Sequence, residues 1–174
     1  DKSLLPFSSS ASLTQYQFDR LKPYFKNIYL SSKTNKFDFI SDNELLLDEN
    51  KDVFSPILAL NTIFDKFQNQ KIFIITVDTP FVSIESISKL IDESKDVDIC
   101  VAQTEKIHNL CGVFSSNISL AIKNMIENNT KFEILNQKAE NIEKVRQRFF
   151  TIVLILPIIF FLLKNSIIEE VDLN

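Results

Sequence analysis

Glycine is almost missing from this chain. Gly112 is the single glycine in 174 residues, whereas average usage of about 7% would give roughly a dozen. Proteins that bind phosphate groups commonly hold them with a glycine-rich loop, and the sequence contains no such loop. Either the protein does not act on phosphates, or the loop lies outside this sequence. Residues 1–7 favour the second alternative, because they lack an initiator methionine and read like the middle of a domain.

Cysteine and positive charge are also scarce. The two cysteines, Cys100 and Cys111, have neither the spacing of a metal site nor a Cys-x-x-Cys arrangement, so we expect buried thiols in a reducing, cytoplasmic compartment. A net charge of -4 argues against a nucleic-acid-binding surface. A hydrophobic share of 45% in 174 residues is enough for one soluble domain with its own core.

The most informative segment that is present is residues 72–77, a run of β-branched and aromatic side chains without alternation, followed by Asp78, Thr79 and Pro80. Such a run is typical of a strand inside a parallel sheet covered by helices. Because Pro80 has no N–H to donate, we expect the strand to end near Thr79. Asp78 would then lie at the carboxyl end of a central strand, where open α/β sheets bind ligands. There it either holds Mg²⁺ against substrate phosphates or only caps the next helix.

Helical and strand patterns alternate along the rest of the chain. Apolar spacing and cap residues predict helices at 13–25, 55–67, 83–94 and 117–128, and strands at 27–32, 44–48, 72–79, 96–103 and 108–114. This alternation predicts an α/β fold, in which helices cover a mostly parallel sheet in three layers.

The sequence changes character after residue 148. We assign residues 1–148 to the α/β domain and residues 149–174 to an atypical tail, which begins with an apolar stretch at 149–163. As a helix this stretch would be roughly 22 Å long, which is short of the ~30 Å core of a bilayer, so we do not expect a membrane as a partner. A buried strand–proline–strand, a product of a shifted reading frame and a short membrane anchor remain the alternatives.

Each candidate site residue has an ordinary structural explanation when it is considered alone. Lys2 would more often be a solvated surface lysine, and Asp48, at the end of a predicted strand, would more often close a turn. His108 is the single histidine, and a lone histidine in an apolar strand usually makes a structural hydrogen bond.

Three motifs nevertheless occur in an order that resembles one known family. Asp1-Lys2-Ser3-Leu4-Leu5 begins the chain, Asp48 ends a predicted strand, and Asp78 stands in Val-Asp-Thr-Pro-Phe. Over residues 1–128 this order is similar to that of the molybdenum cofactor guanylyltransferases, which belong to the sugar-nucleotide-type nucleotidyltransferases. In that family a glycine-rich loop precedes the Asp-Lys motif. Residues 108–114 also resemble the family's His-Pro-x-x-Gly-Leu strand, with asparagine in place of proline.

The resemblance implies a Rossmann-like domain that transfers GMP from GTP to molybdopterin and releases pyrophosphate. It implies Lys2 and Asp78 as catalytic residues, Lys2 and Asp48 as GTP-binding residues, and Asp78 as the ligand of a Mg²⁺ cofactor. GTP and molybdopterin would be the substrates, and molybdoenzymes or cofactor-insertion proteins the protein partners. Ser31 and Ser55 replace the family's asparagine and glycine near the nucleotide. Transfer of a cytidylyl or other nucleotidyl group, and a non-catalytic remnant of the family, remain the alternatives.

Overall fold

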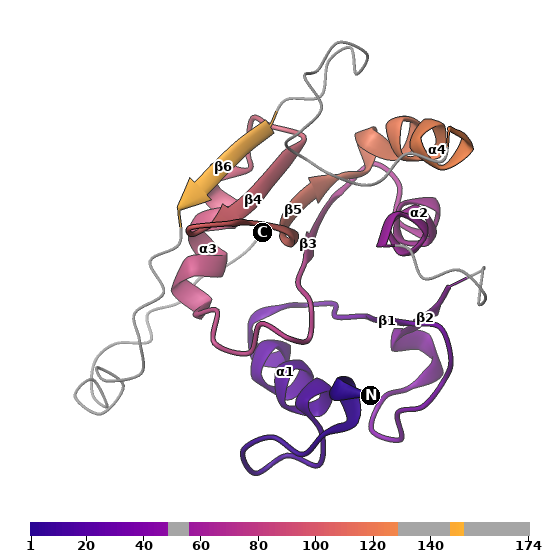
Figure 1. The fold of residues 1–174 in the computed structure, drawn as a ribbon, viewed down its shortest axis with the longest axis vertical. Coiled ribbons are helices and arrows are strands. Elements are labelled where there is room, and N and C mark those ends of the chain that lie inside the picture. Colours follow the sequence, from indigo (N-terminus) through magenta and orange to yellow (C-terminus); the bar gives the residue numbers. More distant parts are fainter. Residues whose placement is uncertain (49–55, 129–146, 152–174) are drawn as a thin grey trace.

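The computed structural model describes residues 1–48, 56–128 and 147–151, and its helices and strands follow one another in short alternating units (Figure 1). The helices are α1 (Leu13–Leu21), α2 (Pro56–Lys66), α3 (Ile84–Glu93) and α4 (Ser119–Glu127), with the 3-10 turns η1 (Lys2–Leu4), η2 (Lys22–Tyr24), η3 (Asp42–Glu44) and η4 (Ser116–Ile118). The strands are β1 (Leu30–Ser32), β2 (Leu45–Leu47), β3 (Lys71–Ile74), β4 (Ile99–Gln103), β5 (Ile107–Ser115) and β6 (Gln147–Thr151).

The described strands form two sheets, and the prediction of a mostly parallel sheet is wrong. β1 and β2 make a parallel pair, while the larger sheet has the order β3-β5-β4-β6. In the larger sheet β5 is antiparallel to both β3 and β4, and only β4 and β6 are parallel. The physical reason is the connection between β4 and β5, because three residues can join antiparallel strands but are too few for a parallel crossover. β5 lies between β4 and β3 and is antiparallel to both.

Apolar side chains on the two faces of the larger sheet form two separate cores, so the fold has helix, sheet and helix layers. The first core joins α2 and α4 to Ile99, Val101 and Phe114 of the strands. The second core joins α1 and α3 to Cys100, Ala102 and Cys111. Because neighbouring strand residues point to opposite faces, β3, β4 and β5 each contribute to both cores. Figure 1 shows α3 on one side of the sheet and α2 and α4 on the other.

Serine side chains cap two of the helices that flank the site. Ser12 accepts a hydrogen bond from the backbone N–H of Gln15 at the start of α1 (3.1 Å), and Ser83 accepts one from Ser86 at the start of α3 (3.1 Å). Side-chain oxygens at this position satisfy N–H groups that have no partner within the helix. Two turns use residues with a positive φ that are not glycine, Ser8 (φ 54°) and Asn69 (φ 58°).

The strand that precedes Asp78 is shorter than predicted and occupies a different position. β3 ends at Ile74, which pairs with Gly112, and it is an edge strand of the larger sheet rather than a central one. Gly112 also pairs with Val101 of β4, and beyond it the register between β4 and β5 shifts, so that the next paired residues of β5 are His108 and Ile107. Asp78 therefore lies in a turn beyond the strand, not at the strand's last residues.

The tail is described only at its beginning. β6 crosses the predicted start of the tail at residue 149. It pairs in parallel with β4, for example Phe149 with Val101. The remaining residues of the tail, 152–174, lie outside the described part of the chain, as does Ser55. Among the described helices, none has the length and apolar character needed to cross a bilayer.

Candidate active site

The turn that carries Asp78 is closed by its own hydrogen bonds. The backbone N–H and the hydroxyl of Thr79 both donate to the carbonyl oxygen of Thr76, at 3.3 and 2.8 Å. The N–H of Val82 then donates to the carbonyl oxygen of Thr79 at 3.4 Å. Pro80 is buried between them. Asp78 thus lies on a defined turn, with its side chain exposed to solvent.

Arg20 of α1 ties the end of this turn to the helix. Its Nη1 donates to the carbonyl oxygen of Val82 at 2.6 Å, while its Nε and Nη2 donate to Oε1 of Gln17 at 3.1 and 2.7 Å. Burial lowers the pKa of the Arg20 guanidinium, yet arginine remains charged in proteins. The turn and α1 are therefore joined by a charge-assisted hydrogen bond, which is stronger than one between neutral groups.

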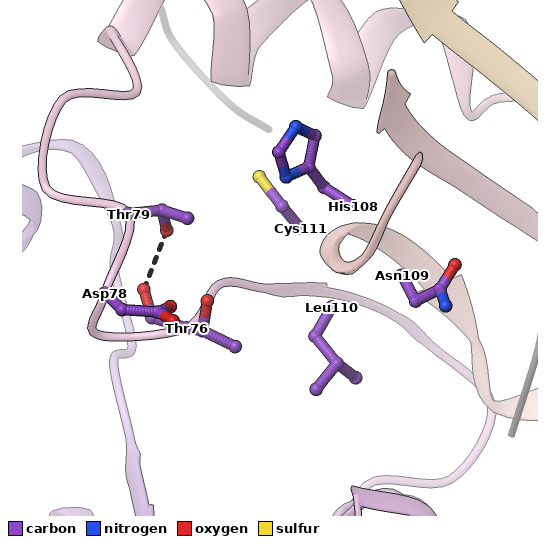
Figure 2. Close-up of a pocket in the computed structure, with 7 residues that line it drawn as sticks. All are labelled: Thr76, Asp78, Thr79, His108, Asn109, Leu110 and Cys111. Carbon is purple, nitrogen blue, oxygen red and sulfur yellow. Dashed lines mark hydrogen bonds between the residues drawn. The ribbon is translucent and has the colours of Figure 1, made fainter. Parts of the chain in front are cut away.

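A cavity of about 250 Å³ opens beside the turn. It is lined by Thr76, Asp78 and Thr79 of the turn and by residues 108–111 of β5, and Figure 2 shows how these side chains lie around it. Pockets for drug-sized ligands usually measure about 300–1,000 Å³. The cavity is therefore somewhat smaller than a typical pocket of that kind.

The β5 side of the cavity offers one oriented polar side chain and one neutral thiol. Nε2 of His108 lies 3.0 Å from the hydroxyl of Thr104, which fixes the plane of the imidazole ring. Burial raises the pKa of the Cys111 thiol to about 11. Because thiolates, not thiols, act as nucleophiles, the neutral Cys111 thiol is a poor nucleophile at neutral pH. The contact with Thr104 agrees with the structural hydrogen bond expected of a lone histidine. His108 also lines the same cavity as Asp78.

Lys2 lies in η1, outside the residues that line the cavity. η1 is held by Asp1, whose carboxylate accepts from the N–H and hydroxyl of Ser3 at 3.0 and 2.7 Å and pairs with Lys36. The hydroxyl of Thr14 on α1 also donates to the carbonyl oxygen of Ser3 at 2.8 Å. The Lys2 side chain itself is exposed. Its backbone is therefore anchored, while its ammonium group is free to move.

Aromatic contacts bring the segment after η1 next to the Asp78 turn. Phe7 packs edge-on against Phe81, with ring centroids 5.9 Å apart, and against Tyr16 of α1 at 4.8 Å. Phe81 follows Asp78 by three positions and is 76% exposed. The structure thus brings the N-terminal segment and the turn together, although no hydrogen bond or ion pair joins Lys2 to Asp78 among the described residues.

Asp48 lies at the end of the small parallel sheet. Its carboxylate accepts a hydrogen bond from the Ser31 hydroxyl at 3.2 Å, and its N–H donates to the carbonyl oxygen of Ser32 at 3.0 Å. Ser31 lies in β1 and Asp48 directly follows the neighbouring strand β2, so the two predicted nucleotide-side positions are adjacent. Asp48 does not line the cavity beside Asp78.

The oxygen groups at the turn suit a hard cation only if a substrate completes the site. Within the described residues there is no cluster of three or more histidine, cysteine, aspartate or glutamate side chains that could hold a metal ion. Mg²⁺, however, is usually bound by one or two carboxylates together with substrate phosphates and water. The exposed carboxylate of Asp78, which forms no hydrogen bond or ion pair with the described part of the chain, fits that pattern.

Comparisons with known proteins decide the family. A family model described as "MobA-like NTP transferase domain" matches residues 1–142. The chain belongs to this family. This MobA-like chain is 35% identical over 132 residues to a protein of Campylobacter jejuni (strain RM1221) named molybdenum cofactor guanylyltransferase, which covers 74% of the chain and 68% of the relative. The resemblance found in the sequence is therefore confirmed.

Solved structures share the fold of this MobA-like chain. A putative protein from Aquifex aeolicus VF5 superposes with a TM-score of 0.67 at 24% identity, covering 81% of this chain and 74% of that one. A Mycobacterium tuberculosis H37Rv protein in complex with manganese gives a TM-score of 0.59 at 12% identity, covering 87% and 81%. At these identities the likeness establishes the fold alone.

The residues that hold the turn are not evident from the sequence. Thr76 and Thr79 lie within the strand predicted over residues 72–79, and Arg20 lies within the helix predicted over residues 13–25. The Thr-x-x-Thr spacing around Asp78 was a signal for a closed turn, because threonine hydroxyls commonly bond to nearby backbone groups. Nothing near Arg20 in the sequence indicates its contact with Val82, which is 62 positions away.

Proposed function

We propose that the protein is a molybdenum cofactor guanylyltransferase, which transfers GMP from GTP to the terminal phosphate of molybdopterin and releases pyrophosphate. The observation that carries this proposal is the exposed carboxylate of Asp78 on a closed turn beside a cavity. The name of the Campylobacter jejuni relative supports the nucleotide and the acceptor. We place the reaction in the cytoplasm, since both cysteines are buried thiols.

The chemistry requires that two anions meet. When bound, Mg²⁺ would neutralise phosphate charge and orient the reacting oxygens. Asp78 would hold the metal, because its carboxylate has no other partner among the described groups and points to solvent. The manganese complex of the Mycobacterium tuberculosis protein supports a divalent cation in this fold. No side-chain nucleophile is needed, because a phosphate oxygen of the acceptor attacks directly.

Lys2 and Asp48, which do not line the cavity beside Asp78, would bind other parts of the nucleotide. Lys2 has an anchored backbone and an exposed ammonium group, which can follow the triphosphate as its charge is redistributed. Asp48 is oriented by Ser31 and would accept hydrogen bonds from the N–H groups of guanine or orient neighbouring groups. Binding partners among molybdoenzymes or cofactor-insertion proteins would receive the product.

The metal role is tested by Asp78→Asn, with Asp92→Asn as the control. Asp92 is an exposed carboxylate of α3 that pairs with Lys95. We expect Asp78→Asn to lower kcat by about a thousandfold or more, since a bound metal contributes several kcal/mol of charge stabilisation, and Asp92→Asn to leave it unchanged. Circular dichroism verifies that both variants fold. Full activity of a folded Asp78→Asn would eliminate the proposed metal site.

The choice of base is tested by calorimetric titration with Mg·GTP and Mg·CTP. Selective binding of GTP would support guanylyl transfer, and stronger binding of CTP would support cytidylyl transfer. If neither nucleotide binds, the non-catalytic alternative is favoured for this stretch of chain. The same titration on a chain extended by about twenty upstream residues would then show whether a glycine-rich loop restores binding.

A further inference from the structure

We propose that Arg20 is a positioning residue that sets the location of the Asp78 carboxylate and thereby its affinity for the metal–nucleotide complex. The proposal rests on the proposed function, in which Asp78 holds a divalent cation. It goes further by assigning a role to a residue of α1 that does not line the cavity and that no sequence motif contains.

No contact of its own side chain holds Asp78 in place among the described residues. Its carboxylate forms no hydrogen bond or ion pair with the residues that the structure describes, and it is exposed. Its location is therefore determined by the backbone of the turn. That backbone is fixed at one end by the bonds from Thr79 to Thr76 and at the other by Val82.

Arg20 holds the far end of the turn through Val82. Val82 is 6% exposed, and its carbonyl oxygen accepts the 2.6 Å hydrogen bond from Nη1 of Arg20. The N–H of the same residue bonds to Thr79. A continuous series of hydrogen bonds thus leads from α1 through Val82 and Thr79 to Thr76, and Asp78 lies inside it.

Gln17 holds the guanidinium of Arg20 in the orientation in which it contacts the turn. Gln17 is 5% exposed, and its Oε1 accepts from both Nε and Nη2 of Arg20. The opposite orientation of the Gln17 amide would place its NH2 group against the two N–H donors of Arg20. The two side chains therefore hold each other in one orientation. The buried Nε2 of Gln17 has no partner among the described residues, which shows that the amide is oriented for Arg20 rather than for its own hydrogen bonding.

The test compares binding of Mn·GTP with binding of GTP in EDTA, both by calorimetry. The dissociation constant for metal-free GTP divided by that for Mn·GTP is a ratio that measures how much the metal contributes to binding. We expect Arg20→Met to lower this ratio at least fivefold while the affinity for metal-free GTP stays within twofold. Arg20→Lys should retain most of the ratio, because an ammonium group can still donate to the carbonyl oxygen of Val82.

The matched control is Lys22→Met, which removes a positive charge just beyond the same helix. Lys22 pairs with Glu44 at 3.8 Å and not with the turn. A purely structural role of Arg20 would lower the fraction of binding-competent protein and leave the ratio unchanged. An unchanged ratio in folded Arg20→Met, or an equal drop in Lys22→Met, would overturn the proposal.

Two further measurements separate the possible failures. If Arg20→Met does not fold, Gln17→Leu replaces it, and the ratio should fall about threefold because the guanidinium loses its fixed orientation; no change overturns the proposal. If Asp78→Asn leaves the wild-type ratio intact, the proposed metal role itself has failed. Amide hydrogen exchange at residues 76–82 then decides about Arg20: exchange at least tenfold faster in Arg20→Met than in Lys22→Met supports positioning, and equal exchange overturns it.

Discussion

Gly112 is required by close packing between strands rather than by a turn. A Cβ atom at this position would lie 2.2 Å from the carbonyl oxygen of Cys100 and 2.7 Å from Cα of Val101. Both are backbone atoms of β4, so they cannot rotate away as a side chain would. We expect Gly112→Ala to lower the free energy of unfolding by roughly 1–3 kcal/mol, measured by urea denaturation. A loss below about 0.5 kcal/mol, the usual effect of a surface substitution, would contradict this reading.

Because the Cys111 thiol is buried, we expect the protein to lose stability at alkaline pH. Burial raises its pKa to about 11 from an ordinary value of 9.0. The unfolded state therefore loses its thiol proton first, and stability decreases as the pH rises through this window. Two pKa units correspond to about 2.7 kcal/mol. In Cys111→Ala the stability should decline less steeply between pH 9 and 11 than in the wild type, as measured by urea midpoints; parallel curves would argue against this origin.

Single residues could be predicted from the sequence only where a local motif marks them. Asp78 was found because an apolar run, a carboxylate and a proline follow one another. The predicted strand is too long, because the pairing of β3 with β5 ends at Gly112, beside a register shift between β4 and β5, and such a tertiary feature cannot be read from a local pattern. Arg20 could not be found, since its partner Val82 is distant in sequence. The roles of Lys2, Asp48 and Asp78 remain predictions.

At the scale of elements, α3 shows how one face of a helix contributes to stability. Leu90 is fully buried in the second core, while Lys89, its neighbour in sequence, is exposed and pairs with Glu85 at 3.0 Å. We expect Leu90→Ala to destabilise the protein by about 2–5 kcal/mol. Lys89→Ala should change stability by less than about 0.5 kcal/mol, because exposed i,i+4 ion pairs contribute little. Thermal or urea denaturation distinguishes the two, and equal effects would contradict the assigned face.

The sequence predicted the order of the elements well and the direction of the strands poorly. The segments expected at 13–25, 83–94 and 108–114 correspond to α1 with η2, to α3 and to β5. Helical and strand periodicity are local properties, so they can be read from a single sequence. Direction depends on pairing, which the alternating pattern alone does not determine. The three residues between β4 and β5 were nevertheless a usable signal for an antiparallel pair.

The molecule as a whole should unfold in one transition. The sequence contains no tryptophan, and all of its tyrosines precede β1, in what is here called the N-terminal part: Tyr16, Tyr24 and Tyr29. Their fluorescence therefore reports on that part, while the thiols Cys100 and Cys111 report on the larger sheet. The second core contains Leu21 of α1, and Phe25 stacks on Phe73 of β3 with ring centroids 5.8 Å apart, so the two parts share a core.

We therefore expect tyrosine fluorescence and thiol accessibility to give the same urea midpoint. Two separated midpoints, with the tyrosine signal changing first, would show that the N-terminal part opens independently of the larger sheet. The Leu90→Ala variant should shift both signals together if the core is shared.

The positive φ angles of Ser8 and Asn69 have a consequence for the chain before it folds. At such positions most proteins use glycine, which has no Cβ penalty but retains the widest range of backbone conformations when unfolded. This chain instead accepts some local strain at Ser8 and uses the tolerance of asparagine at position 69. With a single glycine in 174 residues, its disordered ensemble is narrower than that of an average sequence. Less conformational entropy is lost on folding, which favours the native state without any additional contact.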